Sequence, residues 1–141
     1  MAAFGGAWKV MPLLGALALI VTMSSAGLPA LNGFVGEFTI LLGAFGSQVL
    51  NNPWFAGIAT IGVILAAVYL LFMFERVFLG ALRNPETAAL RDINLREVLM
   101  LVPLLVLIFW IGLYPAPFFN LINPTAQQLE QIVQTAALAL R

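Results

Sequence analysis

Apolar residues occur in four long stretches along this chain of 141 residues. The stretches are residues 11–26, 34–48, 53–74 and 98–119. The first two contain about 15 residues each, which span roughly 22 Å as a helix, against roughly 30 Å for the hydrocarbon core of a membrane. The pattern predicts an all-α integral membrane protein in which the first two stretches are too short to cross separately.

The segment between the first two stretches has the composition of a helix break. It reads Gly27-Leu28-Pro29-Ala30-Leu31-Asn32-Gly33. Pro29 removes a backbone donor, and the two glycines lower the cost of non-helical geometry. Such residues most often serve to interrupt a helix. We therefore interpret residues 11–48 as one broken helix, with Gly27, Pro29, Asn32 and Gly33 at the break.

The positions of the basic residues support a single broken crossing. If residues 11–48 cross once, Lys9 and the arginines between positions 76 and 96 lie on the same side, as the positive-inside rule expects. Two full crossings would place them on opposite sides. We expect about three transmembrane passes, over 11–48, 53–79 and 96–116, with the basic groups cytoplasmic. A hairpin that re-enters from one face is the alternative.

The C-terminal part of the chain has a different pattern. From Pro124 to Leu140, glutamines and one glutamate are interspersed with aliphatic residues, a spacing that suits an amphipathic helix lying on a membrane or a partner. We divide the chain into a membrane helical domain over residues 1–120 and an amphipathic tail over 121–141.

Glu37 is the only Asp, Glu, Lys or Arg between Lys9 and Glu75. An isolated charge at the centre of a bilayer costs roughly 2.5 to 3.5 kcal/mol on insertion scales, so such residues usually face a protein interior or a wet cavity. A helix break offers that setting, because its freed backbone groups are tolerated only when buried in protein or hydrated. We interpret Glu37 as a proton or ion site. The structural alternative is a glutamate whose hydrogen bond holds a helix contact.

Composition agrees with a membrane setting and excludes several kinds of site. The chain is 62% hydrophobic and 9% charged, with mean hydropathy +1.05, whereas soluble domains have roughly 25% charged residues. Its net charge of zero gives no basic surface for nucleic acid. It contains no cysteine and no histidine, which excludes disulfides, haem or iron–sulfur ligation and the usual zinc sites. We expect no metal and no cofactor in this chain.

Several motifs in a fixed order point to a known family. They are Phe4-Gly5-Gly6 with Met11-Pro12, the run from Gly27 to Gly33 followed by Phe34-Val35-Gly36-Glu37-Phe38, Tyr69-Leu70 through Glu75-Arg76-Val77-Phe78, Asn94-Leu95-Arg96-Glu97, and Ile111-Gly112-Leu113-Tyr114-Pro115. Together they resemble the antiporter-like subunit M of respiratory complex I, the proton-pumping NADH:quinone oxidoreductase. The resemblance covers nearly the whole chain, from about Phe4 to Phe119.

This resemblance implies a discontinuous helix followed by two closing helices. It also implies that Glu37 ends a line of charged residues through the membrane and acts as a proton relay. Related subunits carry lysine at this position, so Gly36-Glu37-Phe38 favours subunit M. A full-length subunit has many more spans, and we therefore expect a C-terminal portion, with Met1 an internal methionine, a split-gene start or the start of an incomplete reading frame.

The resemblance also implies a function and a set of partners. The chain would belong to the membrane arm of NADH:quinone oxidoreductase and take part in proton translocation coupled to quinone reduction, with no redox catalysis of its own. NADH, FMN, iron–sulfur clusters and quinone would bind to partner subunits. The expected partners are other membrane-arm subunits, the missing N-terminal helices of the same subunit and the lipid bilayer, in a bacterial inner (plasma) membrane.

Two other functions stay open from the sequence. One is a subunit of a multisubunit cation/proton antiporter, whose large subunits share this architecture and which would show sodium-dependent exchange without NADH. The other is a structural membrane fragment with no transport role, in which a neutral residue could replace Glu37 without consequence.

Overall fold

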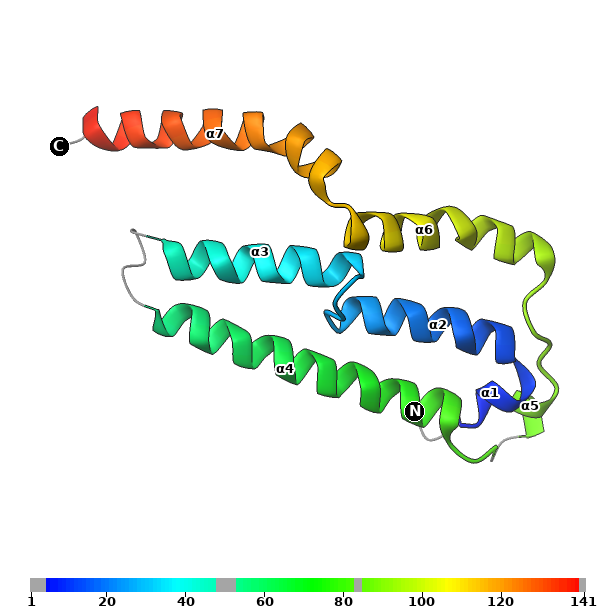
Figure 1. The fold of residues 1–141 in the computed structure, drawn as a ribbon. Coiled ribbons are helices and arrows are strands. Elements are labelled where there is room, and N and C mark those ends of the chain that lie inside the picture. Colours follow the sequence, from blue (N-terminus) through cyan, green and yellow to red (C-terminus); the bar gives the residue numbers. More distant parts are fainter. Residues whose placement is uncertain (1–4, 48–52, 83–84, 140–141) are drawn as a thin grey trace.

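The computed structural model describes residues 5–47, 53–82 and 85–139, and every regular element within these ranges is a helix. In chain order the elements are α1 (Ala7–Val10), α2 (Pro12–Ser25), α3 (Asn32–Gly46), α4 (Trp54–Phe74), the π-helix η1 (Glu75–Leu79), α5 (Pro85–Ala88), α6 (Leu95–Leu113) and α7 (Ala116–Ala139). η1 follows α4 directly, so the two form one long rod (Figure 1). The prediction of an all-α fold is confirmed.

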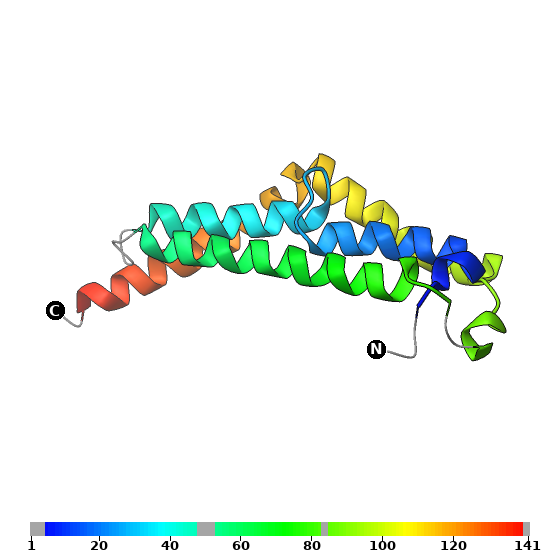
Figure 2. The ribbon, with the colours of Figure 1, turned by 90° about the horizontal axis from the view of Figure 1, so that it is seen from below.

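The two short helices α2 and α3 run in the same direction. Figure 1 shows them following one another along the molecule, with α3 displaced sideways where they meet, and Figure 2 shows the same order from below. α4 runs back along both of them and contacts both. A re-entrant hairpin would need two antiparallel pieces, so that alternative does not describe this chain.

Within the described ranges, two helices are long and apolar enough to cross a membrane. They are the rod Trp54–Leu79, of 26 residues, and α6, of 19 residues. Their large apolar side chains are mostly exposed in this chain, among them Ile58, Leu65 and Leu104. Exposed apolar surface of this extent on long helices requires lipid or further protein around it.

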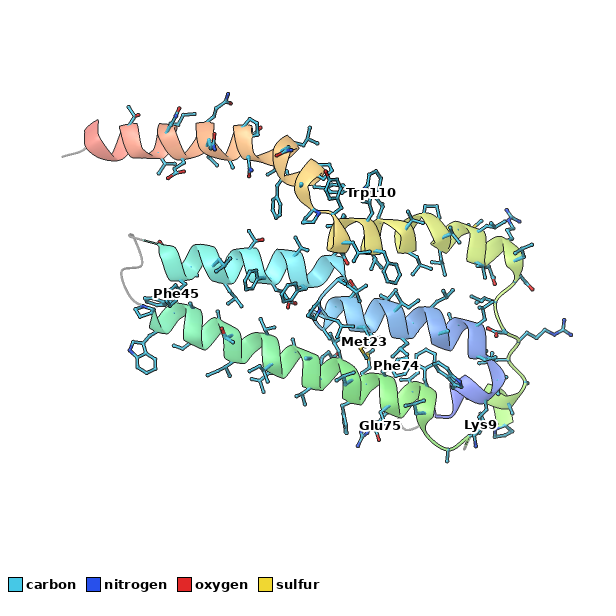
Figure 3. The ribbon with its side chains drawn as sticks, in the orientation of Figure 1. Lys9, Met23, Phe45, Phe74, Glu75 and Trp110 are labelled. Atoms are coloured by element: carbon cyan, nitrogen blue, oxygen red, sulfur yellow. The ribbon has the colours of Figure 1, made fainter. Side chains whose placement is uncertain are left out.

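The tightest side-chain packing anchors α1 and α2 to the end of α4. Phe74 is only 4% exposed, and its ring meets Trp8 edge-on with centroids 6.2 Å apart and stacks on Phe78 at 4.8 Å. Figure 3 shows Phe74 and Met23 in the space between α2 and α4. Gly15 leaves room for the indole, because a Cβ atom there would lie 2.7 Å from a Trp8 ring carbon.

Lys9 lies at the end of the molecule where the arginine-containing loop begins and ends. The short helix α1 contacts both η1 and α5. Gly6, with φ +71°, sits directly on the backbone at Leu82, where a side chain would not fit. Lys9 is therefore at the same end of the molecule as the arginines of residues 76–96, as a single crossing by α2 and α3 requires. Of these arginines, Arg83 lies outside the described residues.

Asp92 completes the hydrogen bonding at the start of α2. Residue Met11 precedes this helix and has no side-chain acceptor, while its own N–H donates to a carbonyl of α1 at 2.8 Å. Pro12 has no N–H. The next two N–H groups, of Leu13 and Leu14, donate to the two carboxylate oxygens of Asp92 at 2.8 and 3.0 Å. Asp92, in the loop before α6, thus accepts hydrogen bonds from first-turn N–H groups that an N-cap side chain usually satisfies.

The pKa of Asp92 reflects these contacts. Partial burial raises the pKa of its carboxyl, but backbone N–H groups of Leu13, Leu14 and Ile93 hydrogen-bond the charged form, and the net pKa lies below the ordinary value of 3.8. The carboxylate is therefore ionised at neutral pH, which also suits its place at the positive end of the α2 dipole.

The helix expected over 96–116 is observed as α6, Leu95–Leu113. Its start is a capping box, in which the Asn94 side chain accepts from the backbone of the first turn and the Asn94 N–H donates to Glu97 Oε2 at 2.8 Å. The helix continues through Pro103.

The tail expected over 121–141 is observed within a longer helix, α7, that begins at Ala116. Its early start has a local cause. The Pro115 carbonyl accepts hydrogen bonds from two N–H groups of the first turn, at 3.0 and 3.1 Å, and Pro117 falls in that turn, where a missing N–H does no harm. α7 extends from the end of α6 away from α2 (Figure 1), and its side chains from Asn120 to Val133 are exposed.

We predict that Asp92 gives this fold an acid-sensitive component of stability. Because the pKa of Asp92 is lower in the folded state, its contribution is complete above about pH 4, the ordinary value for Asp, and is lost as the pH falls through the lowered pKa. Thermal unfolding of the purified protein in detergent between pH 6 and pH 2.5 should show a loss of stability that is smaller in Asp92→Asn.

Glu97→Gln serves as the matched control, since it changes another carboxylate of the same region that caps only its own helix. The stability of Glu97→Gln should still show the loss at low pH that is due to Asp92 and that is absent in Asp92→Asn. Equal pH profiles for the wild-type protein and Asp92→Asn would contradict this prediction.

Candidate functional site

The C-terminal end of α2 closes in a Schellman motif. Gly27 has φ +72°, in the left-handed region that favours glycine. The N–H of Leu28 donates to the carbonyl of Met23 at 3.1 Å, and the N–H of Gly27 donates to the carbonyl of Ser24 at 3.2 Å. This is the 6→1 and 5→2 pairing that satisfies the last carbonyls of a helix. The carbonyls of Met23 and Ser24 are thus paired where the interruption begins.

The chain crosses from α2 to α3 in a short, partly strained turn. Ala30 has φ +76°, the one positive φ at a non-glycine residue among those described. The N–H of Leu31 donates to the carbonyl of Leu28 at 3.1 Å, and Leu31 is buried, with 5% exposure. Pro29 is exposed on this turn. A non-glycine residue in this region costs energy and needs surrounding contacts to hold it.

A polar pair joins the two halves across the break. The Ser24 hydroxyl, from the last turn of α2, donates to the side-chain carbonyl of Asn32, the first residue of α3. Ser24 is 4% exposed. Gly33 lies against the Ser24 carbonyl so closely that any side chain at position 33 would overlap it. Asn32 and Gly33 therefore set the distance between the end of α2 and the start of α3.

Glu37 lies one and a half turns into α3, and its carboxylate reaches back to the break. Side chains of an α-helix lean toward the N-terminus, so this direction is the expected one. The carboxylate touches Gly27 and occupies the space that a side chain at position 27 would need. Glu37 is partly buried, and within the described ranges its carboxylate forms no ion pair and accepts no hydrogen bond.

Helix α6 closes the break from another side. Gly112, one residue before the end of α6, lies on the backbone of Ala30 and Leu31, and a Cβ atom there would be 2.5 Å from Leu31 Cα. Small residues allow this kind of close approach between membrane helices. The sequence contained a signal for this contact, a single glycine inside a long apolar helix, but nothing that identified its partner.

The structure thus brings together most of the residues proposed from the sequence. Gly27 and Glu37 are in contact, Asn32 and Gly33 touch Ser24, and Pro29 lies on the exposed side of the turn. Their roles stay predictions. Among the described residues, no three His, Cys, Asp or Glu side chains are close enough to hold a metal ion. What the arrangement offers chemically is a single carboxylate beside interrupted backbone, where water can supply hydrogen bonds and protons.

Several known proteins are similar to this chain. Residues 1–66 match the family model described as NADH:quinone oxidoreductase/Mrp antiporter, TM. The chain is 38% identical over 128 residues to NADH-quinone oxidoreductase subunit M of Rickettsia prowazekii, and 40% identical over 130 residues to the protein of the same name from Rhodobacter capsulatus. These matches cover 91% and 92% of this chain and 25% of each relative.

A solved structure is also similar. The structure of respiratory complex I from Thermus thermophilus with bound NADH contains a chain that matches with TM-score 0.77 and 31% sequence identity. The match covers 90% of this chain and 26% of the Thermus chain. At this identity the likeness concerns the sequence as well as the fold.

Both kinds of similarity include the break. The family match contains Gly27, Gly33 and Glu37, and the subunit M matches extend over nine-tenths of the chain. The chain spans about a quarter of the length of the relatives that it matches. Residues 1–66 thus resemble the NADH:quinone oxidoreductase/Mrp antiporter membrane family, and about nine-tenths of the chain is similar to a portion of NADH-quinone oxidoreductase subunit M.

Proposed function

We propose that this chain takes part in proton translocation within the membrane arm of an NADH:quinone oxidoreductase, and that Glu37 is the group that takes up and releases the proton. The observation that carries the proposal is the position of the Glu37 carboxylate, against Gly27 at the interruption between α2 and α3. The family relationship supports the same function, since the relatives that match are subunits of that enzyme.

The break exposes Glu37 to two opposing helix ends. The C-terminal end of α2 carries partial negative charge, and the N-terminal end of α3 carries partial positive charge. In the described ranges no side chain caps α3, so its first N–H groups are not neutralised in that way. A relative movement of the two halves would change the distances between the Glu37 carboxylate and both helix ends.

The chemistry of this chain is protonation, and the redox steps belong elsewhere. NADH, FMN, iron–sulfur clusters and quinone are proposed to bind to partner subunits. The exposed apolar side chains of α4 and α6 support contacts with lipid, with other membrane-arm subunits and with further helices of the same subunit. The bacterial relatives support a location in the inner membrane.

A second candidate follows from the description of the family model, which also names the Mrp antiporters. In that function Glu37 would exchange protons during sodium or other cation transport without NADH. Sodium-dependent proton exchange by vesicles that lack NADH oxidation would favour it, whereas co-purification with flavin and iron–sulfur subunits would favour the first function.

We predict that Glu37→Gln lowers proton pumping in the assembled complex. Glutamine keeps the shape of the side chain and much of its hydrogen bonding, but it cannot exchange a proton near neutral pH. Inverted membrane vesicles supplied with NADH and quinone should show a smaller proton gradient per quinone reduced, and Glu37→Asp should retain part of the activity.

Assembly must be measured in the same vesicles, because a lost acceptor at a partly buried site can destabilise a fold by roughly 1 to 3 kcal/mol. Fully assembled Glu37→Gln complexes that pump and reduce quinone at wild-type rates would show that Glu37 is not the proton-exchanging group.

We also predict that Gly27→Ala disturbs the site from the other side. The new methyl group would overlap the Glu37 carboxylate, and alanine at φ +72° costs roughly 1 to 2 kcal/mol. Pumping should fall about as far as in Glu37→Gln. Gly36→Ala is the control, since a Cβ atom at position 36 meets nothing within 4 Å in this chain. If the two variants behave alike, the contact at Gly27 has no special role.

A further inference from the structure

Helix α6 is attached to the broken helix at two separate points. Before its start, Asp92 holds the first turn of α2 through Leu13 and Leu14. Near its end, Gly112 sits on the backbone of the break at Ala30 and Leu31. At the first point, Asp92 is 79 positions along the chain from Leu13 and 78 from Leu14. The two points of attachment lie at opposite ends of a segment that contains α2 and the turn that follows it.

We propose that α6 is a strut that sets the position of the break relative to the start of α2, with Asp92 and Gly112 as its two attachments. Asp92 is then a positioning residue for the Glu37 carboxylate, which it does not touch. The functional consequence rests on the proposed role of Glu37, whereas the strut itself does not.

The attachment at Asp92 is specific because it uses both oxygens of an ionised group. Each oxygen accepts one N–H of α2, and Oδ1 also accepts the N–H of Ile93 at 2.8 Å, which ties the carboxylate to the chain that enters α6. Hydrogen bonds to a charged acceptor are about twice as strong as neutral ones. The lowered pKa of Asp92 keeps that charge in place at neutral pH.

The α2 helix can transmit this attachment to the break. It has 14 residues and therefore extends about 21 Å, and its Schellman motif places Gly27 directly beyond its last turn. A shift or rotation of α2 at its start would move Gly27 against the Glu37 carboxylate and against Gly33. The second attachment at Gly112 opposes that movement, because the contact there is backbone on backbone and has no flexible side chain to yield.

The test uses hydrogen exchange of backbone amides in the assembled complex, read in peptides that cover Gly27 to Leu31. In Asp92→Asn, a single oxygen and an NH₂ group face two N–H donors, so at least one bond is lost. Exchange at Leu28 and Leu31 should become about threefold to tenfold faster. Asp92→Glu retains a carboxylate and should restore most of the protection. Pumping per quinone reduced should follow the same order.

Two controls separate the strut from general loosening. Glu97→Gln alters a carboxylate that caps only α6 and should leave exchange at the break at the wild-type rate. Peptides of α4 should exchange normally in every variant. Faster exchange in Asp92→Asn that is confined to Leu13 and Leu14, or that spreads equally to α4, would overturn the proposal.

Gly112→Ala tests the second attachment independently. It replaces Asp92→Asn as the test if the Asp92→Asn complex does not assemble. Its methyl group would overlap the Ala30 carbonyl and should also speed exchange at Leu28 and Leu31. Unchanged exchange there would overturn the proposal. A failure of Glu37→Gln to lower pumping, with faster exchange at the break in both strut variants, would reject the role of Glu37 and leave the strut standing.

Discussion

An interrupted helix in a membrane is stable only if its free backbone N–H and C=O groups find partners, and contacts at both ends of α2 supply such partners. At the end of α2 the Schellman motif of Gly27 pairs the last carbonyls. At its start Asp92 pairs the N–H groups of Leu13 and Leu14. Glycines at positions 33 and 112 let neighbouring backbones approach the turn closely.

The same requirement explains the position of Glu37. A carboxylate is costly to place in hydrocarbon, and the break is the place in this apolar half of the chain where the regular backbone hydrogen bonding of the helices is interrupted. Gly27 has two tasks there, since its left-handed φ closes α2 and its missing side chain leaves space for the carboxylate. The backbone geometry that ends the helix is thus also the geometry that admits the charged group.

Local features were predictable from the sequence, whereas contacts between distant segments were not. The Gly27 to Gly33 run predicted the break, and the isolated Glu37 indicated where to look for a site, because both signals lie within a few residues. Nothing in the sequence near Asp92 indicates that its carboxylate accepts hydrogen bonds from Leu13 and Leu14, which are 79 and 78 positions away. The early start of α7 was missed because prolines that end one helix can equally begin the next, as those at 115 and 117 do.

The two half-helices begin in unequal ways, and this difference bears on the role proposed for Glu37. The start of α2 is held by an ionised side chain and has no unpaired N–H in its first turn. The start of α3 has no side-chain cap among the described residues and is joined to α2 through the Ser24–Asn32 pair, with the Glu37 carboxylate nearby. If Glu37 exchanges a proton as proposed, the change of charge occurs at its contact with Gly27, between the held start of α2 and the start of α3.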